Sequence, residues 1–411
     1  MKREVSKLMT KEILIAGAGI GGLTAALALL RNGVRVKIFE QASGLGDIGA
    51  GVQIAPDGTR VLIALGLERA MESVICPAAW KEVRLWDTGQ SWKLFDLGRD
   101  SIERFHAPYW FVHRGDLHRV LREAVLEAGG NIEVGATCES YAQDDSGVIL
   151  KLADGREIHA DALVGADGVH SRLRNQMFGD AKPIYTGIVA WRGLVEVSRL
   201  SPELRHPIGT NWIGPGGHVI TYPVRRGELL NIAAFCERND WVLESWSTPG
   251  TRDEFAADFP GWNPLIHEII QNVDTPYKWA LIGRDALLCW TDRRVTLLGD
   301  ACHPTLPFLA HGAIMAIEDG YALARCVEAE PKISDAFLCY ERMRVDRTKA
   351  IVNGSAANAK RFHNPLLSDA KEAVRYVESE WTPEKVRRRY DWLFEYDATT
   401  APIGVPAVAL G

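Results

Sequence analysis

Residues 12–40 read EILIAGAGIGGLTAALALLRNGVRVKIFE, and this stretch decides how the chain begins to fold. Residues 12–16 form a short apolar, partly β-branched run of the kind that makes a buried parallel strand. Leucines at helical spacing follow, and Asn32-Gly33 supplies a helix stop. Residues 34–39 have the pattern of a second strand. The stretch therefore predicts a strand, a glycine-rich turn, a helix and a second strand.

The turn between the first strand and the helix has GxGxxG spacing, formed by Gly17, Gly19 and Gly22. The first glycine permits a tight turn, the second lets the backbone approach a pyrophosphate, and the third lets helix and strand pack closely. Glu40 follows about 20 residues later, where a carboxylate accepts hydrogen bonds from a ribose. The glycines alone also fit a structural turn, but the strands, helix and acid around them favour dinucleotide binding.

Residues 13–30 also imitate a signal peptide or a membrane span, because they carry no charge and follow a basic N-terminal stretch. Glycines interrupt this run, and a strand ending in Glu40 follows it, whereas a signal peptide would be followed by a cleavage site of small residues. We therefore expect a cytoplasmic protein with no membrane partner.

The composition is that of a folded globular protein. The chain has 411 residues, of which 47% are hydrophobic and 24% are charged. Its net charge of -6 does not favour nucleic-acid binding, which depends on basic patches. The seven cysteines include no CxxC pair, so we expect neither a metal site nor a disulfide framework.

Two further strand-like runs end in turns that carry an acid. Residues 160–166 lead into Asp167-Gly168, with Ser171 and Arg174 beyond, and residues 294–298 lead into Gly299-Asp300. Each is a common kind of turn when taken alone.

Together with the N-terminal unit, these motifs resemble those of the single-component FAD-dependent aromatic hydroxylases, which share the fold of para-hydroxybenzoate hydroxylase. The resemblance extends from Lys11 to Asn364. In detail the chain is most similar to salicylate and 3-hydroxybenzoate hydroxylases, through residues 47–53, 113–118 and 316–319.

The resemblance implies an α/β fold in which a Rossmann-like FAD-binding domain carries an inserted, mostly antiparallel β-sheet substrate domain and a helical C-terminal region. The FAD-binding domain is expected at residues 10–181 and 285–365, and the substrate domain at residues 182–284, where β-rich runs are found. Residues 366–411 would form a C-terminal helix and tail.

The resemblance also implies a monooxygenase that uses FAD, dioxygen and NADH or NADPH. It would hydroxylate a phenolic acid of the salicylate or 3-hydroxybenzoate type through a flavin hydroperoxide. The chain has one GxGxxG unit, which fits an enzyme that holds FAD permanently and binds the nicotinamide cofactor only briefly. The family pattern also permits a homodimer.

The family pattern assigns cofactor roles to particular residues. Asp167 and Arg174 match a motif that serves both FAD and NAD(P)H, and Asp300 would bind the ribityl chain. Arg114 would contact the flavin, and a helix beginning near Gly312 would direct its N-terminus at the flavin pyrimidine edge. The complete set expected to bind FAD is Gly17, Gly19, Gly22, Glu40, Val52, Arg114, Asp167, Arg174, Asp300, Gly312 and Ala313.

Hydroxylation of a phenol is helped by a base that removes or shares the phenol proton. His218 is the expected base, because it begins a strand at a position where related hydroxylases carry a pocket histidine. The alternative is a turn histidine bonded to the backbone. Tyr222, on the same strand face, is expected either to bond to the substrate or to pack. Pro307 and Phe308 are expected to line the substrate pocket, although some relatives carry a histidine or glutamine there.

Several alternatives stay open at this point. His311 either touches the flavin or caps the helix, and Arg192 and Arg84 are candidates for binding a substrate carboxylate. The substrate could instead be a hydroxypyridine carboxylate, or the protein could be an FAD-dependent reductase or epoxidase of the same fold. A non-enzymatic binding protein would tolerate loss of Asp167 and Asp300, and both are present.

Overall fold

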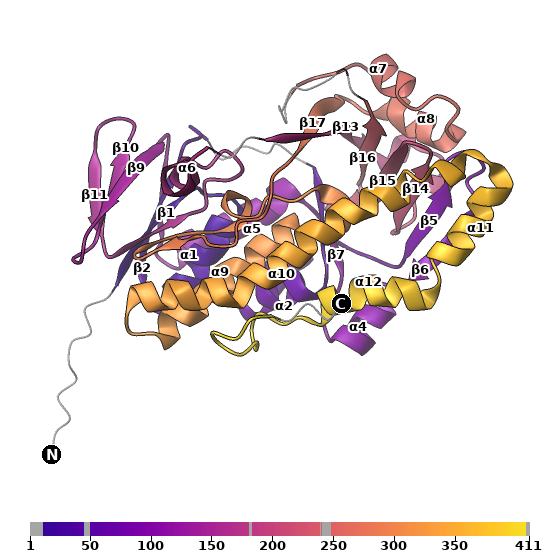
Figure 1. Cartoon of the computed structure of the whole chain (residues 1–411). Coiled ribbons are helices and arrows are strands. Elements are labelled where there is room, and N and C mark those ends of the chain that lie inside the picture. The colour runs from indigo at the N-terminus through magenta and orange to yellow at the C-terminus, as the bar shows by residue number, and fades with distance from the viewer. Residues whose placement is uncertain (1–10, 45–49, 181–182, 239, 241–247, 408–411) are drawn as a thin grey trace.

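The computed structural model describes residues 11–44, 50–180, 183–238, 240 and 248–407. Residues 47–49 of the motif at residues 47–53 lie outside the described residues, as do residues 10, 181–182 and 408–411 at the expected domain limits. Figure 1 shows one half built around β1, β2 and α1 and a second half built around β13 to β17. The long helix α10 (Ile333–Phe362) extends from the first half to the second.

The first sheet is built outward from the N-terminal strand–helix–strand unit. β1 (Glu12–Ala16) lies between β2 (Arg35–Glu40) and β12 (Ala162–Gly165) and is parallel to both. α1 (Ile20–Arg31) joins β1 to β2. The apolar run of β1 is buried because it occupies the middle of a parallel sheet covered on its faces. The predicted Rossmann-like unit is therefore present in the molecule.

Three more strands complete this sheet, whose order is β18-β19-β12-β1-β2-β8. β19 and β8 continue the parallel pairing, and β18 ends the sheet with an antiparallel pair. These strands are β8 (Asn131–Val134), β18 (Thr291–Asp292) and β19 (Val295–Leu297).

The helix α1 packs closely against a second helix that begins at the same end of this sheet. α1 contacts both α5 (Arg114–Glu127) and α9 (Gly312–Ala329). Gly320 of α9 lies against Ala25, where a Cβ on Gly320 would be 2.6 Å from the Ala25 amide nitrogen. A Cβ on Gly21, near the start of α1, would lie 3.1 Å from the Cβ of Ala316 near the start of α9. Glycine is required for both approaches.

The second sheet has seven strands in the order β17-β13-β16-β15-β14-β5-β6. All its pairs are antiparallel except that of β14 with β5. β5 and β6 come from inside the residue range that the sequence assigned to the FAD-binding domain, so the sheet is assembled from distant parts of the chain. Its strands are β5 (Lys81–Leu85), β6 (Ser91–Phe95), β13 (Ile184–Glu196), β14 (Gly209–Gly214), β15 (Gly217–Val224), β16 (Leu229–Glu237) and β17 (Tyr277–Gly283).

A separate apolar cluster lies between this sheet and two short helices, α7 (Arg252–Ala257) and α8 (Pro264–Asn272). Its aromatic members include Trp191 and Phe255, whose rings stack at 4.9 Å between centroids. Figure 1 shows α7 and α8 on the outer side of the second half. Trp191 therefore serves the core, as is usual for a large apolar side chain.

Two small sheets and the remaining helices complete the described fold. One small sheet has the order β3-β7-β4 and the other β11-β10-β9. Their strands are β3 (Gly51–Ile54), β4 (Ile75–Pro77), β7 (Trp110–His113), β9 (Cys138–Gln143), β10 (Val148–Leu152) and β11 (Glu157–Ala160). The helices are α2 (Pro56–Ala64), α3 (Glu68–Glu72), α4 (Arg99–Phe105), α6 (Arg172–Phe178), α11 (Ala370–Glu380) and α12 (Pro383–Glu395). Short 3-10 helices are η1 (Val197–Arg199), η2 (Pro202–Leu204), η3 (Arg225–Gly227), η4 (Gly299–Ala301), η5 (Pro307–Leu309) and η6 (Pro365–Ser368).

The uncharged run at residues 13–30 forms β1 and most of α1 in the core of the first half. Within the part of the chain that the structure describes, none of the helices is long and apolar enough to span a bilayer.

Candidate functional site

The fold places four of the predicted cofactor residues at one edge of the first sheet. Gly17 follows β1, Glu40 ends β2, Asp167 follows β12, and Asp300 follows β19. These strands are neighbours and run parallel, so their carboxyl ends meet at the same edge. Ligands of open α/β sheets bind in the crevice outside the carboxyl ends of the strands.

The three glycines of the GxGxxG turn differ in how closely they are packed. Gly17 has φ +103°, and a Cβ there would lie 2.3 Å from the carbonyl oxygen of Ala166. A Cβ on Gly22 would lie 2.1 Å from the Gly17 carbonyl oxygen, so both glycines are needed for backbone packing. A Cβ on Gly19 would meet no atom within 4 Å. The turn is thus packed at its first and third glycines and open at the second, directly before the N-terminus of α1.

Glu40 is held in position by backbone groups. Its Oε2 accepts a hydrogen bond of 2.8 Å from the Ala18 N–H, and its Oε1 accepts one of 2.9 Å from the Ala42 N–H. A carboxylate oxygen can accept more than one hydrogen bond, so both oxygens retain capacity for the hydroxyls of a ribose. The Ala18 carbonyl oxygen lies 2.7 Å from Nε2 of His118 on α5, which fixes the same turn from a second side.

Asp300 and Arg114 border the same space. Asp300 is accessible to solvent, yet the protein atoms around its carboxyl partly desolvate it and so raise its pKa. The charges of His303 and Arg114 oppose this rise. Arg114, exposed at the start of α5, also lowers the pKa of buried Arg192, although burial is the larger cause. A carboxylate and a guanidinium therefore lie near each other at what we call the cofactor edge, the edge of the first sheet at which the carboxyl ends of its parallel strands meet.

Asp167 and Arg174 are arranged around the start of α6. Oδ2 of Asp167 accepts hydrogen bonds from the N–H groups of Arg172 at 2.9 Å and Leu173 at 3.4 Å. Arg174 is buried, and its guanidinium donates to Oδ1 of Asn175. Burial and the nearby charge of Arg284 lower the Arg174 pKa. Asp167 therefore accepts hydrogen bonds from the first N–H groups of α6. Arg174 is buried in the first turn of the same helix.

The loop of residues 307–311 leads into α9 and carries the predicted pocket residues. Phe308 is buried, and Pro307 and the expected FAD residues Val52, Gly312 and Ala313 are half-buried. The Phe308 N–H donates to Ser355 Oγ at 3.2 Å, and its carbonyl accepts from Asn358 Nδ2 at 3.1 Å, which anchors the loop to α10. The loop is therefore held by side chains from the C-terminal part of α10.

His311 occupies the N-cap position of α9 and faces an oxygen with each ring nitrogen. Its Nδ1 lies 2.6 Å from the Leu309 carbonyl oxygen, and its Nε2 lies 3.3 Å from Oδ2 of Asp57 on α2. Oδ2 of Asp57 also accepts a hydrogen bond of 2.9 Å from Arg347. Burial opposes ionisation of Asp57, but His311 and Arg347 together keep its pKa below the usual value. One expected role for His311 was to cap the helix, but its side chain makes no capping hydrogen bond to α9 and contacts the loop and α2 instead.

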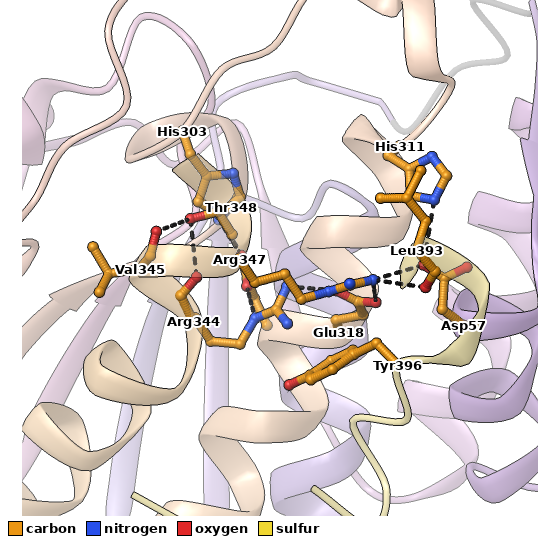
Figure 2. A network of polar contacts seen from close by, with 12 residues as sticks. Asp57, His303, His311, Glu318, Arg344, Val345, Arg347, Thr348, Leu393 and Tyr396 are labelled. Carbon is orange, nitrogen blue, oxygen red and sulfur yellow. Dashed lines mark hydrogen bonds and ion pairs between the residues drawn. The ribbon is translucent and has the colours of Figure 1, made fainter. Parts of the chain in front are cut away.

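Arg347 links this ion pair to a larger buried set of charges, which we call the charged network (Figure 2). Arg347 donates to both oxygens of Glu318, and Arg344 bridges Glu318 at 2.6 Å and Asp319 at 2.7 Å. Oδ2 of Asp319 lies 2.6 Å from Nε2 of His303. The charged network comprises Asp57, His303, His311, Glu318, Asp319, Arg344 and Arg347, all buried.

The charged network fixes two loops, the turn that carries Asp300 and the loop that leads into α9. Oδ2 of Asp319 accepts the Gly299 N–H at 3.1 Å, so it holds the turn that carries Asp300. At the other end His311 fixes the start of α9. Burial disfavours the Asp319 carboxylate, but His303 and Arg344 lower its pKa below the usual value. Sequence reasoning missed Asp57 and both arginines, although acids inside the apolar α9 could have signalled buried partners.

His218, the expected base, is fully buried at the start of β15. Its ring stacks on Phe235 of β16 with centroids 4.5 Å apart and meets the edge of Phe308 at 5.1 Å. Its Nδ1 lies 2.6 Å from Nε2 of His363, directly after α10. Burial and the neighbouring His363 bring the His218 pKa well below its usual value. His218 is therefore a neutral imidazole in contact with the loop expected to line the substrate pocket.

His363 and Glu237 were not expected from the sequence. Nδ1 of His363 lies 3.0 Å from Oε1 of Glu237, the last residue of β16. Burial lowers the pKa of His363, and the Glu237 carboxylate opposes this effect. No local pattern marks this trio, because its members come from β15, β16 and the end of α10.

The other candidates for substrate contact differ in their surroundings. Tyr222 is buried, with its ring 5.2 Å from that of Phe111 and against Gly51, and burial raises its pKa. Arg84 is 2.5 Å from Glu82, which already neutralises its charge. Arg192 is buried with its guanidinium 5.5 Å from the ring centroids of both Tyr277 and Trp279.

Known proteins are similar to this chain in sequence and in fold over nearly its whole length. A family model described as an FAD binding domain matches residues 10–355. The 3-amino-4-hydroxybenzoate 2-monooxygenase of Streptomyces platensis is 38% identical over 393 residues, covering 95% of this chain and 97% of that protein. The 3-hydroxybenzoate 6-hydroxylase of Polaromonas naphthalenivorans is 35% identical, covering 94% and 96%. The solved substrate complex of a salicylate hydroxylase is 26% identical with a TM-score of 0.78, covering 96% and 97%.

Proposed function

The chain belongs to the family of FAD-dependent aromatic hydroxylases, and we propose that it hydroxylates a phenolic aromatic acid with NADH or NADPH as electron donor. As a member of this family it binds FAD and is a flavin-dependent monooxygenase of aromatic substrates. The proposal concerns the class of substrate, the electron donor and the residues that act.

The observation that carries the proposal is the state and place of His218. A base that takes a phenol proton must be neutral before it acts, and burial keeps His218 neutral at pH 7. Its ring touches Phe308 in the loop before α9, whose N-terminus lies at the cofactor edge. We therefore assign His218 as the general base for the phenol hydroxyl.

The other site residues would bind the cofactor and the substrate. FAD, when bound, supplies electron transfer from the nicotinamide and the activation of dioxygen. The open glycine turn and Glu40 would hold its adenosine diphosphate half, and Asp300 and Arg114 its flavin half. Arg192 would attract a substrate carboxylate, because it is a buried cation that lies near the charge of Arg114.

The experiment that tests the proposal measures oxidation of NADH and NADPH by the FAD-loaded protein with a panel of ring acids. The panel contains salicylate, 3-hydroxybenzoate, 3-amino-4-hydroxybenzoate and a hydroxypyridine carboxylate, and both hydroxylated product and peroxide are measured. Stimulated oxidation with hydroxylated product supports the proposal and identifies the ring. Product from the hydroxypyridine alone, or no stimulation by any ring acid, contradicts the phenolic assignment.

A further inference from the structure

We propose that His218, His363 and Glu237 form a proton relay that connects the substrate pocket with solvent. We call these three residues the histidine relay. This inference rests on the proposed function of His218 as the base, and it adds a route by which the proton leaves the base.

The hydrogen bonds of the histidine relay have one consistent direction. An ionised carboxylate only accepts, so Glu237 Oε1 must accept a proton-bearing Nδ1 of His363 across 3.0 Å. A neutral His363 then has a lone pair on Nε2, which accepts Nδ1–H of His218 across 2.6 Å. This fixes the His218 tautomer and leaves its Nε2 with a lone pair. Nε2 of His218 is buried and has no hydrogen-bond partner among the described residues.

The exposure of the three side chains increases from one end to the other. His218 is 0% exposed, the His363 side chain is 2% exposed, and that of Glu237 is 58% exposed. The first member can therefore accept a proton from a buried ligand, and the last can release it to water. A buried base without such a connection would have to retain its proton or return it to the ligand.

The backbone of one glycine holds the relay together. Gly216, with φ +68°, donates its N–H to the His363 carbonyl oxygen at 3.3 Å and accepts the Glu237 N–H at 2.9 Å. Gly217 is the residue before His218 and pairs with Cys236 across the strands. The turn therefore sets the separation of all three relay residues through main-chain contacts, which favours a defined function over a chance contact.

The surroundings of the two rings are almost entirely apolar. His218 is enclosed by Phe235 of β16, Phe308 of η5 and Phe362 of α10. The titratable groups that act on the two imidazoles are the imidazoles themselves and Glu237. Among the described residues, the hydrogen-bonding group that His218 contacts is His363, so a proton arriving at His218 would move on through it.

The transfer balances without any change in oxidation state. The phenol O–H bond breaks as Nε2 of His218 takes the proton, and Nδ1–H of His218 passes to Nε2 of His363. Nδ1–H of His363 then passes to Glu237, which releases a proton to water. One proton leaves the substrate and one enters solvent. The reverse sequence protonates a phenolate product and restores both tautomers.

The test measures proton release when a phenolic acid binds, before any turnover. The FAD-loaded protein is mixed in a stopped-flow instrument with 3-hydroxybenzoate in weak buffer containing a pH indicator, while phenolate absorbance is followed in parallel. His363→Gln keeps a donor for Glu237 and an acceptor for His218 but cannot carry a proton. We expect proton release to become ~10-fold slower or more in this variant, with FAD still bound.

Two further variants keep the relay falsifiable if His363→Gln folds poorly. Glu237→Gln is at the surface and should slow proton release severalfold, whereas Glu196→Gln, at the end of the neighbouring strand β13 and 51% exposed, should leave it unchanged. Proton release at the wild-type rate in both relay variants overturns the relay and leaves the hydroxylase assignment intact. Failure of the wild-type protein to bind or hydroxylate any phenolic acid overturns the proposed function instead.

Discussion

Two buried polar clusters contact the loop of residues 307–311, and they differ in charge and in closure. The charged network contacts it through His311 and is built from carboxylates and guanidiniums that face one another, with every member buried. The histidine relay contacts it through Phe308 and ends in a carboxylate at the surface. A closed set of opposite charges holds a fixed geometry, whereas two neutral imidazoles that lead to an exposed carboxylate can pass a proton. This difference leads us to expect that the charged network holds the loops in place, whereas the histidine relay transfers a proton.

The largest effect is expected from the buried end of the histidine relay. His218→Ala should reduce hydroxylation by ~10²–10⁴-fold, because the phenol loses its base. FAD should remain bound, since Gly17, Glu40, Asp167 and Asp300 lie at the edge of the first sheet and His218 belongs to the second. Product formation per unit of FAD is measured by chromatography, with His267→Ala on α8 as the control. An unchanged rate would remove His218 from the mechanism.

The charged network should instead respond with a loss of stability. Arg347→Met leaves Asp57 and Glu318 buried without their shared partner, which should cost about 3–5 kcal/mol of unfolding free energy. Arg99→Met, whose side chain is 66% exposed, should change it by no more than about 0.5 kcal/mol. Urea denaturation measures both. Equal stability of the two variants would contradict a supporting role for the network.

The sequence predicted the first half of the molecule more fully than the second. The strand, glycine turn and helix at residues 12–40 are determined by local patterns, and the acids at 40, 167 and 300 are brought together because parallel strands share one edge. By contrast, the pairing of β5 with β14 depends on tertiary packing of segments far apart in the chain. The partners of His218 are equally remote, since His363 is placed by the length and direction of α10.

A third region, the cofactor edge, can be compared with the two clusters. Loss of one carboxylate there should have a moderate effect on FAD binding. Asp300→Ala removes a charged acceptor for the ribityl chain and should weaken FAD binding roughly 10- to 100-fold, as expected for a hydrogen bond to a charged group. Fluorescence titration of the apoprotein with FAD measures the change. Asp335→Ala, exposed in the first turn of α10, serves as the control. Undiminished affinity in Asp300→Ala would contradict its assigned role, while both clusters could remain as described.

The smallest effect separates the two clusters by the pH at which each loses stability. The pKa of His218 is lowered in the folded protein, so the unfolded chain binds the proton more readily. Its contribution is complete above the unfolded pKa near ~6.5 and is lost as the pH falls below that value, by about 1.4 kcal/mol per pH unit. Asp57 and Asp319 also have lowered pKa values, but as acids they lose their contribution only as the pH falls below about 4. As the pH is lowered from about 7.5 to about 5.5, the urea concentration at the midpoint of unfolding should therefore decrease less in His218→Gln than in the wild-type protein. Identical slopes would show that the two clusters do not differ in their response to protons.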